Sequence, residues 1–331
     1  MLRAGVLAGG LGVAILASCS AGGNPSGVLP LRRAALVALP GDTSRMDYTS
    51  LDNQRHRLFI AHLGQGEIIV VDTRTRHVVG RIPAPGVHGV LAVPELGKVY
   101  VAASDSNEAL TIDADTLTVV ARTPTGGTPD GISYDPADNR VFVSDETGGE
   151  VAVLKATSGV GAGTVSLGGE VGNNSYDPVS RHILALDQTH DELDIINPAT
   201  LTVIARHHLG HCDHSHGLTL DSPTRRAFVA CDGNDQLLTV DLDTFVETDH
   251  TGTGAGPDVV SLDPGLHRLY VAAESGTWTV FGTTNQHTRL IARRHLAAGA
   301  HTLAIDNTTH LVYVPLADTG GHPGLEILIP T

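Results

Sequence analysis

The sequence predicts an all-β protein, a seven-bladed β-propeller of four-stranded blades whose ring is closed by an N-terminal strand completing the last blade. Three observations support this prediction: a repeat of about 42 residues, strand-like alternation within each repeat, and a match between the two ends of the chain. The composition agrees, because 38 glycines and many short runs of Val, Leu and Thr are typical of short strands joined by tight turns.

The repeat has a recognisable frame: an apolar strand, an aspartate, a turn, a basic residue and a second apolar strand. "GISYDPADNRVFVSD" and "VSLDPGLHRLYVAAE" are two copies. Seven markers follow one another at intervals of 42, 41, 42, 44, 42 and 43 residues, and these are Asp52, Pro94, Asp135, Asp177, Asp221, Asp263 and Asp306. Seven copies therefore fill the chain from about Tyr48 to its end.

Each copy contains four predicted strands. In the copy around Asp221 they are "GLTL", "RAFVAC", "QLLTVDL" and "FVETDHT", and turn signals separate the first three. Four-stranded units of this period are the signature of a propeller blade. The apolar spacing of two, without an amphipathic helix, excludes a helical solenoid.

The two ends of the chain together supply the seventh blade. The C-terminal "LEILIPT" matches a third strand, and the fourth strand of that copy is missing. The early segment "LRRAALVALPG" matches fourth strands such as "LTVIARHHLG". We therefore expect the segment around residues 34–39 to form the outer strand of blade seven, which removes two exposed sheet edges.

The second strands of the repeats carry a family resemblance. "VYVAA" at 99–103, "VFVSDETG" at 141–148, "AFVACDGN" at 227–234 and "LYVAAESG" at 269–276, with third strands such as "TVDLDT", resemble the YVTN-repeat propellers, often called YncE-like. The resemblance covers the predicted mature chain and implies the propeller fold. It implies little about function, because propellers serve binding, scaffolding and catalysis alike.

The N-terminal segment predicts where the protein is located. "MLRAGVLAGGLGVAILASCS" has an early arginine, an apolar stretch and small residues, which is the pattern of a secretory signal. Its end resembles the bacterial lipobox, in which Cys19 becomes the lipidated first residue; an ordinary signal peptide is the alternative. We expect a lipoprotein signal peptide over 1–18, a flexible tether over 19–30 and a single propeller domain over 31–331. The protein would then be extracytoplasmic and anchored to the cell membrane by its lipid alone.

Charge limits the partners of the propeller. The formal net charge is −15 and no basic run exceeds two residues, so we expect no nucleic-acid partner. Some relatives in the resembled group bind DNA, and this acidic chain departs from them. A small ligand or a protein of the cell envelope remains a candidate partner, and we expect a monomer.

Polar residues recur where each inner strand begins, at one mouth of the central channel. The position five residues before each marker holds Asp47, Gly89, Asp130, Gly172, His216, Asp258 and His301. The second strand is antiparallel and returns to the same face. We predict that the mouth binds a ligand through His62, His88, Asp130, Asp145, His214, His216, Asp258 and His301.

The histidines are densest in "GHCDHSHG", residues 210–217, which leads into blade five. Imidazoles and carboxylates that converge on an axis favour a divalent metal, zinc or copper by ligand type, held by His214, His216, Asp258 and His301. A polar funnel for a small ligand fits the same residues. The recurring aspartates also permit a structural role, the capping of backbone N–H groups.

Cys212 and Cys231 are predicted to lie close together, because the second strand of blade five ends opposite residues near Ser215. Outside the cytoplasm such a pair favours a disulfide, and thiolate ligands to a metal are the alternative.

Three function classes follow from these patterns. We favour a membrane-anchored binding propeller that takes a small ligand or a divalent metal at the channel mouth. The alternatives are a metal-dependent hydrolase, lactonase-like or a lyase, using the same cluster, and an interaction scaffold of the cell envelope. No Gly-x-Ser-x-Gly motif supports an acyl-enzyme.

Overall fold

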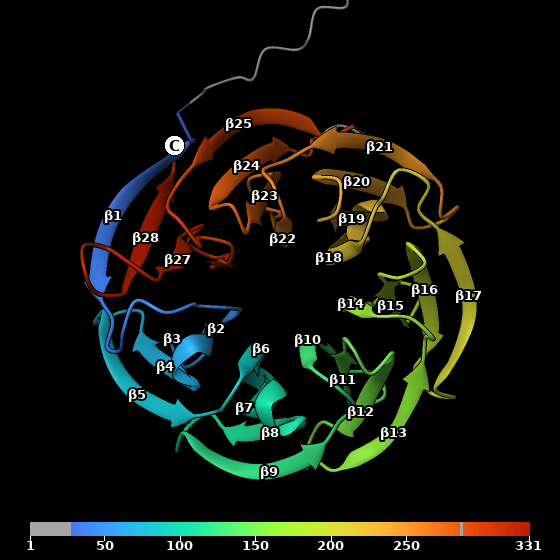
Figure 1. The fold of residues 1–331 in the computed structure, drawn as a ribbon, viewed down its shortest axis with the longest axis horizontal. Coiled ribbons are helices and arrows are strands. Elements are labelled where there is room, and N and C mark those ends of the chain that lie inside the picture. Colours follow the sequence, from blue (N-terminus) through green and yellow to red (C-terminus); the bar gives the residue numbers. More distant parts are fainter. Residues whose placement is uncertain (1–27, 285–286) are drawn as a thin grey trace, which may run out of the picture.

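The computed structural model describes residues 28–284 and 287–331 as seven four-stranded antiparallel sheets arranged in a ring (Figure 1). The predicted all-β, seven-bladed propeller is confirmed. The predicted signal peptide and Cys19 lie outside the described residues, as does the tether up to residue 27.

Within each blade the strands follow one another from the channel outwards. Blades 1 and 2 contain β2 (Thr49–Asp52), β3 (Arg57–His62), β4 (Glu67–Asp72), β5 (His77–Pro83), β6 (Val87–Val93), β7 (Lys98–Ala103), β8 (Glu108–Asp113) and β9 (Thr118–Pro124). Blades 3 and 4 contain β10 (Pro129–Asp135), β11 (Arg140–Asp145), β12 (Glu150–Lys155), β13 (Gly161–Ser166), β14 (Val171–Asp177), β15 (His182–Asp187), β16 (Glu192–Asn197) and β17 (Thr202–His208). Blades 5 and 6 contain β18 (Ser215–Asp221), β19 (Arg226–Cys231), β20 (Gln236–Asp241), β21 (Glu247–Gly252), β22 (Pro257–Asp263), β23 (Arg268–Ala273), β24 (Thr277–Gly282) and β25 (Arg289–His295). Blade 7 contains β26 (Ala304–Ile305), β27 (Val312–Leu316), β28 (Gly324–Pro330) and, from the start of the chain, β1 (Leu31–Ala38).

The closing strand is the one expected from the sequence. β1 pairs antiparallel with β28, from Leu31 opposite Pro330 to Ala38 opposite Gly324. The side chain of Arg268, in blade 6, donates to the Thr331 carbonyl at 2.8 Å and so ties the C-terminus to the ring. In Figure 1, β1 lies at the circumference beside β28.

The marker aspartates hold the turns between first and second strands. Asp135 Oδ1 accepts the Ala137 N–H at 2.8 Å, and Asp306 Oδ1 accepts the Thr308 N–H at 2.9 Å. These are Asx turns, in which a short carboxylate replaces a backbone acceptor. Blade 2, with Pro94 in the marker position, instead forms a short 3₁₀ helix, η2 (Pro94–Leu96).

Three further 3₁₀ turns occur in the described residues: η1 (Leu63–Gln65), η3 (Ser104–Ser106) and η4 (Ser222–Thr224). Each has three residues. Within the described ranges, no helix is long and apolar enough to cross a membrane.

The hydrophobic core lies between neighbouring blades. One apolar cluster joins Phe59 and Val70 of blade 1 to Val101 of blade 2, and similar clusters join other neighbouring pairs. Trp278 is fully buried, and its indole N–H donates to the Ala300 carbonyl at 2.7 Å. Because the blades support one another laterally, their inner ends are held as a fixed ring around the channel.

Candidate metal centre

Three side chains from blades 1, 6 and 7 meet at the end of the channel where the inner strands begin. They are Asp47, Asp258 and His301, and one potential ligand atom of each lies within 4.8 Å of the others. All three occupy the repeat position five residues before a marker. The sequence therefore predicted the place, and Asp258 and His301 were among the residues expected to hold a metal.

Backbone irregularities position Asp258 and the neighbouring His216. In β22 the pairing register shifts between Pro257 and Val259, so Asp258 lies in a β-bulge. β18 has the same shift between Ser215 and Gly217, which places His216 in the corresponding bulge. Because a bulged residue leaves the ladder and re-aims its side chain, the bulges gather polar groups from separate blades.

The distances within the group suit a shared cation better than hydrogen bonds. His301 Nε2 lies 3.8 Å from Asp47 Oδ1 and 3.9 Å from Asp258 Oδ2. These distances exceed the length of a hydrogen bond. Two ligands of a tetrahedral zinc ion, each about 2.0–2.2 Å from the metal, would lie about 3.4 Å apart, so a small inward movement would bring His301 Nε2 to that spacing from each carboxylate.

The group is buried and incompletely satisfied. Asp47 and His301 are 1% exposed and Asp258 is 6% exposed. Within the described residues, Asp47 Oδ2 and both ring nitrogens of His301 lack a hydrogen-bond partner. Buried polar atoms without partners are costly, and a bound ion would satisfy the atoms of this group.

His216 extends the group toward blade 5. Its Nε2 lies 3.1 Å from Asp258 Oδ1, and its Nδ1 lies 3.2 Å from the side-chain oxygen of Gln188. Burial alone would lower the pKa of His216, but the bond and the charge of Asp258 raise it to about 10. The neighbouring carboxylates thus create a strongly negative potential that favours a positive charge here.

The same carboxylates also raise the pKa values of Asp130 and His301. Burial raises the pKa of Asp130 to about 7, and the charge of Asp47 adds to the shift. Burial lowers the pKa of His301, but Asp47, Asp258 and Glu274 outweigh it and the net shift is upward.

Two exposed side chains cover the group. Arg45 donates Nη2 to Glu274 Oε1 at 2.7 Å, and its Nε lies 3.6 Å from Asp47 Oδ2. Glu274 Oε2 in turn lies 3.4 Å from His301 Nδ1. This Arg45–Glu274 pair separates the group from solvent, so the site is enclosed rather than an open rim.

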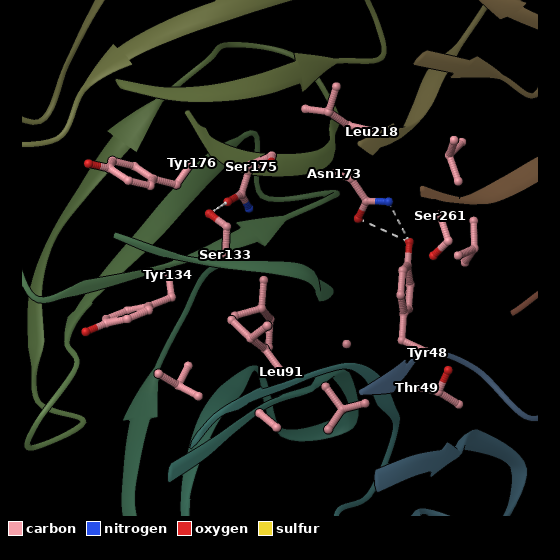
Figure 2. A pocket seen from close by; sticks show the side chains of 18 of the residues that line it. Tyr48, Thr49, Leu91, Ser133, Tyr134, Asn173, Ser175, Tyr176, Leu218 and Ser261 are labelled. Atoms are coloured by element: carbon pink, nitrogen blue, oxygen red, sulfur yellow. Dashed lines mark hydrogen bonds between the residues drawn. The ribbon is translucent and has the colours of Figure 1, made fainter. Parts of the chain in front are cut away.

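Tyr48 and Asn173 form the floor of the site. The Tyr48 hydroxyl donates to Asn173 Oδ1 at 3.1 Å, and Asn173 Nδ2 lies 2.8 Å from the same hydroxyl. The contact joins blade 1 to blade 4, and Figure 2 shows the two side chains reaching toward each other. It divides the channel into a charged compartment and a cavity that continues to the other mouth.

The remaining predicted residues lie outside the three-residue group. His88 contacts the Gly86 carbonyl at 3.0 Å and the Ser104 hydroxyl at 2.8 Å. His214 Nδ1 lies 2.6 Å from Asp232 Oδ1 and its Nε2 lies 3.5 Å from Glu170, so the ring turns away from the channel.

His62 and Asp145, at the far ends of second strands, are also separate from the group. His62 is buried against Ser44, with Nε2 at 3.2 Å from the hydroxyl, and burial lowers its pKa. Asp145 is fully buried against Gly126.

Cys212 and Cys231 are joined by a disulfide, with their Cα atoms 5.3 Å apart. The bond connects the loop that carries His214 and His216 to the end of β19. It leaves no thiolate at these positions to bind a metal.

Three residues of this region, Asp47, Arg45 and Tyr48, were not among the site residues predicted from the sequence. For Asp47 a signal was present, because it shares its repeat position with Asp258. Arg45 and Tyr48 carry no such signal, since their roles depend on which way each side chain extends across the channel.

Comparisons with known proteins agree with this architecture. No family model matches the chain. The chain is 33% identical over 94 residues to proteins of Salmonella typhi and Salmonella typhimurium named "Uncharacterized protein YncE", a match covering 28% of this chain. Over this segment the chain is similar to these YncE proteins. The match spans 27% of the length of these curated relatives.

Solved structures support the fold alone. A chain of hydrazine synthase from Kuenenia stuttgartiensis superposes with a TM-score of 0.71 and 12% identity, covering 88% of this chain and 97% of that one. A chain of a mitotic checkpoint complex superposes with a TM-score of 0.75 and 10% identity, covering 99% of each chain. Because one propeller fold serves unrelated functions, the function of this chain depends on the residues of its own site.

Proposed function

We propose that this protein is a binding propeller that holds a divalent transition metal at the closed end of its channel. Asp47, Asp258 and His301 would be the ligands, with His216 close enough to supply a fourth. The observation that carries the proposal is the buried convergence of these groups within 4.8 Å.

Charge balance favours a cation in this compartment. Three buried carboxylates, on Asp47, Asp130 and Asp258, surround the channel end. The positive charges beside them are those of Arg45 and of protonated His216, so the carboxylates are in excess when Asp130 is ionised. Uncompensated charges inside a protein are strongly unfavourable, so a bound cation would stabilise the ionised carboxylates. Mixed imidazole and carboxylate ligands are typical of zinc, and copper is the second candidate.

The metal proposal is tested by calorimetric titration of zinc chloride into chelator-treated protein. We expect about one zinc per chain, and an affinity reduced roughly tenfold or more in Asp47→Asn and in His301→Gln, since each loses a ligand atom at little change in volume. His214→Ala is the matched control, because this histidine lies in the same region but outside the group, and its affinity should equal that of the unaltered protein.

Two results would overturn the proposal. One is the absence of saturable binding of zinc or copper by the unaltered protein. The other is an equal affinity in Asp47→Asn, His301→Gln and His214→Ala, which would place the ion elsewhere.

The geometry supports binding better than catalysis. A metal-dependent hydrolase needs an open coordination position that a substrate can reach. Here the Arg45–Glu274 pair covers the group on one side and the Tyr48–Asn173 contact lies below it. A binding or structural ion fits this enclosure.

We further propose that the propeller is exported and held at the membrane by a lipid on Cys19. The support is the lipobox-like "LASC" after an apolar signal-like segment. We expect the protein in the membrane fraction and Cys19→Ser in the soluble fraction, with mass spectrometry finding acyl chains on the N-terminal peptide. Equal distribution of the two proteins would contradict the anchor without affecting the metal site.

A further inference from the structure

A cavity of about 680 Å³ occupies the channel below the Tyr48–Asn173 contact. Residues of all seven inner strands or the loops leading into them line it, among them Thr49, Val90, Ile132, Ser175, Leu218, Ser261 and Leu303. Its volume falls in the range of about 300–1,000 Å³ that is usual for small-molecule sites.

The lining of this cavity is almost uncharged. Valine, leucine, isoleucine, alanine and proline form about half of the wall, and tyrosine, serine, threonine and asparagine form most of the rest. Among the described residues, Glu95 is the one acidic or basic residue of the lining. The charged groups of the channel lie on the other side of the Tyr48–Asn173 contact. An ionised ligand in the cavity would therefore lose its hydration without finding a counter-charge.

A few polar groups in the wall are available for hydrogen bonds. Within the described part of the chain, Thr49 Oγ1 is buried without a partner, and the hydroxyls of Ser175 and Ser261 make no hydrogen bond to protein. Figure 2 shows Thr49 and Ser261 close to the Tyr48 side chain, while Ser175 lies farther from it, near Tyr176. Apolar walls with a few convergent polar groups are the usual chemistry of small-molecule pockets.

We propose that this cavity binds an uncharged, largely apolar small molecule with a hydroxyl or amide group, which bonds to the hydroxyls near Tyr48. The apolar part of the ligand would be buried between Val90, Ile132 and Leu218. This site goes beyond the metal site and does not depend on it, because no residue is shared between the cavity lining and the proposed metal ligands.

The probe is N-phenyl-1-naphthylamine, an uncharged secondary amine that carries a phenyl and a naphthyl group. Its fluorescence increases in apolar surroundings. The full mature protein should bind it saturably with one site per chain. Ser261→Phe should reduce the affinity roughly tenfold or more, because the ring fills the space that the probe needs. Ser158→Phe is the matched control, because Ser158 is exposed in the loop between β12 and β13, and it should bind as the unaltered protein does.

The experiment remains decisive if Ser261→Phe does not fold. Ser175→Leu narrows the same cavity from blade 4 and should also weaken binding of the probe. A thermal melt followed by circular dichroism shows whether this variant is folded. Unchanged binding in a folded Ser261→Phe or Ser175→Leu would overturn the proposal, because the probe would then lie on the outer surface. Zinc titration of the same variants should be unaltered, so failure of the cavity proposal and failure of the metal proposal are distinguishable.

Discussion

At the scale of single residues, the protein contains buried carboxylates of two kinds. Asp258 faces a histidine at 3.1 Å, and its pKa is lowered because His216, His301 and Arg45 outweigh the effect of burial. Asp145 is fully buried, and neither carboxylate oxygen has a hydrogen-bond partner of good geometry among the described residues. The first kind has surroundings that favour its charge, whereas the second does not.

Asp145 gives a prediction with a definite sign. Burial raises its pKa from 3.8 to about 6, so at pH 7 the folded state holds an unfavourable charge that the unfolded state does not penalise. The contribution of Asp145 to the free energy of unfolding therefore becomes more favourable as the pH falls from about 6 toward 3.8. Asp145→Asn should raise the free energy of unfolding by about 1–3 kcal/mol at pH 7 and change it little at pH 4.

Urea unfolding at the two pH values measures this difference. Asp138→Asn is the control, because Asp138 is exposed on a turn of the same blade, and we expect little change at either pH. A loss of stability in Asp145→Asn at pH 7 would show that the carboxylate has a stabilising partner. Asp145 would then again be a candidate ligand-binding residue.

At the scale of the secondary-structure element, the turns and strands of each blade explain why the repeat was visible in the sequence. The marker aspartate recurs because an Asx turn needs a short acceptor at one place, as at Asp135 and Asp306. Strand alternation and turn chemistry are local, so the number of blades, the four strands of each blade and the closing strand followed from the sequence.

The site was predictable only in part, for a physical reason at the same scale. Repeat position identifies which residues face the channel, and this placed Asp258, His216 and His301 correctly at one end. Rotamers then decide which of them meet. His214, two residues from His216, turns outward to Asp232, whereas Arg45 and Tyr48 extend inward from positions where the other repeats hold no arginine or tyrosine.

The disulfide between Cys212 and Cys231 also acts at this scale. It closes a hairpin whose two ends are the loop before β18 and the end of β19, so it limits the movement of the loop that carries His216. Such a bond stabilises mainly by restricting the unfolded chain. Its position beside the proposed metal site makes the geometry of blade 5 less dependent on a bound ion.

At the scale of the whole molecule, the channel depends on a closed ring, because its lining comes from all seven blades. The ring closes where β1 joins β28, and Leu29 and Leu39, on either side of β1, are both buried. Loss of β1 would expose the edge of β28. It would also weaken the hydrogen bond that Arg268 donates to the Thr331 carbonyl just after β28. An unpaired edge of this kind recruits strands from other molecules.

We therefore expect a variant that begins at Gly41 to unfold at a temperature lower by roughly 10 °C or more and to self-associate, because a strand of the seventh sheet and its buried neighbours are lost. A variant that begins at Val28 keeps β1 and is the control, with an unchanged midpoint and a monomeric elution volume. The synthetic peptide LRRAALVALPG, residues 31–41, should restore both properties when added to the shortened protein, because it can pair with β28 as β1 does. An unchanged midpoint without β1 would show that six complete blades and an open seventh hold the ring on their own, and the closing strand would then serve only to connect the propeller to the preceding segment.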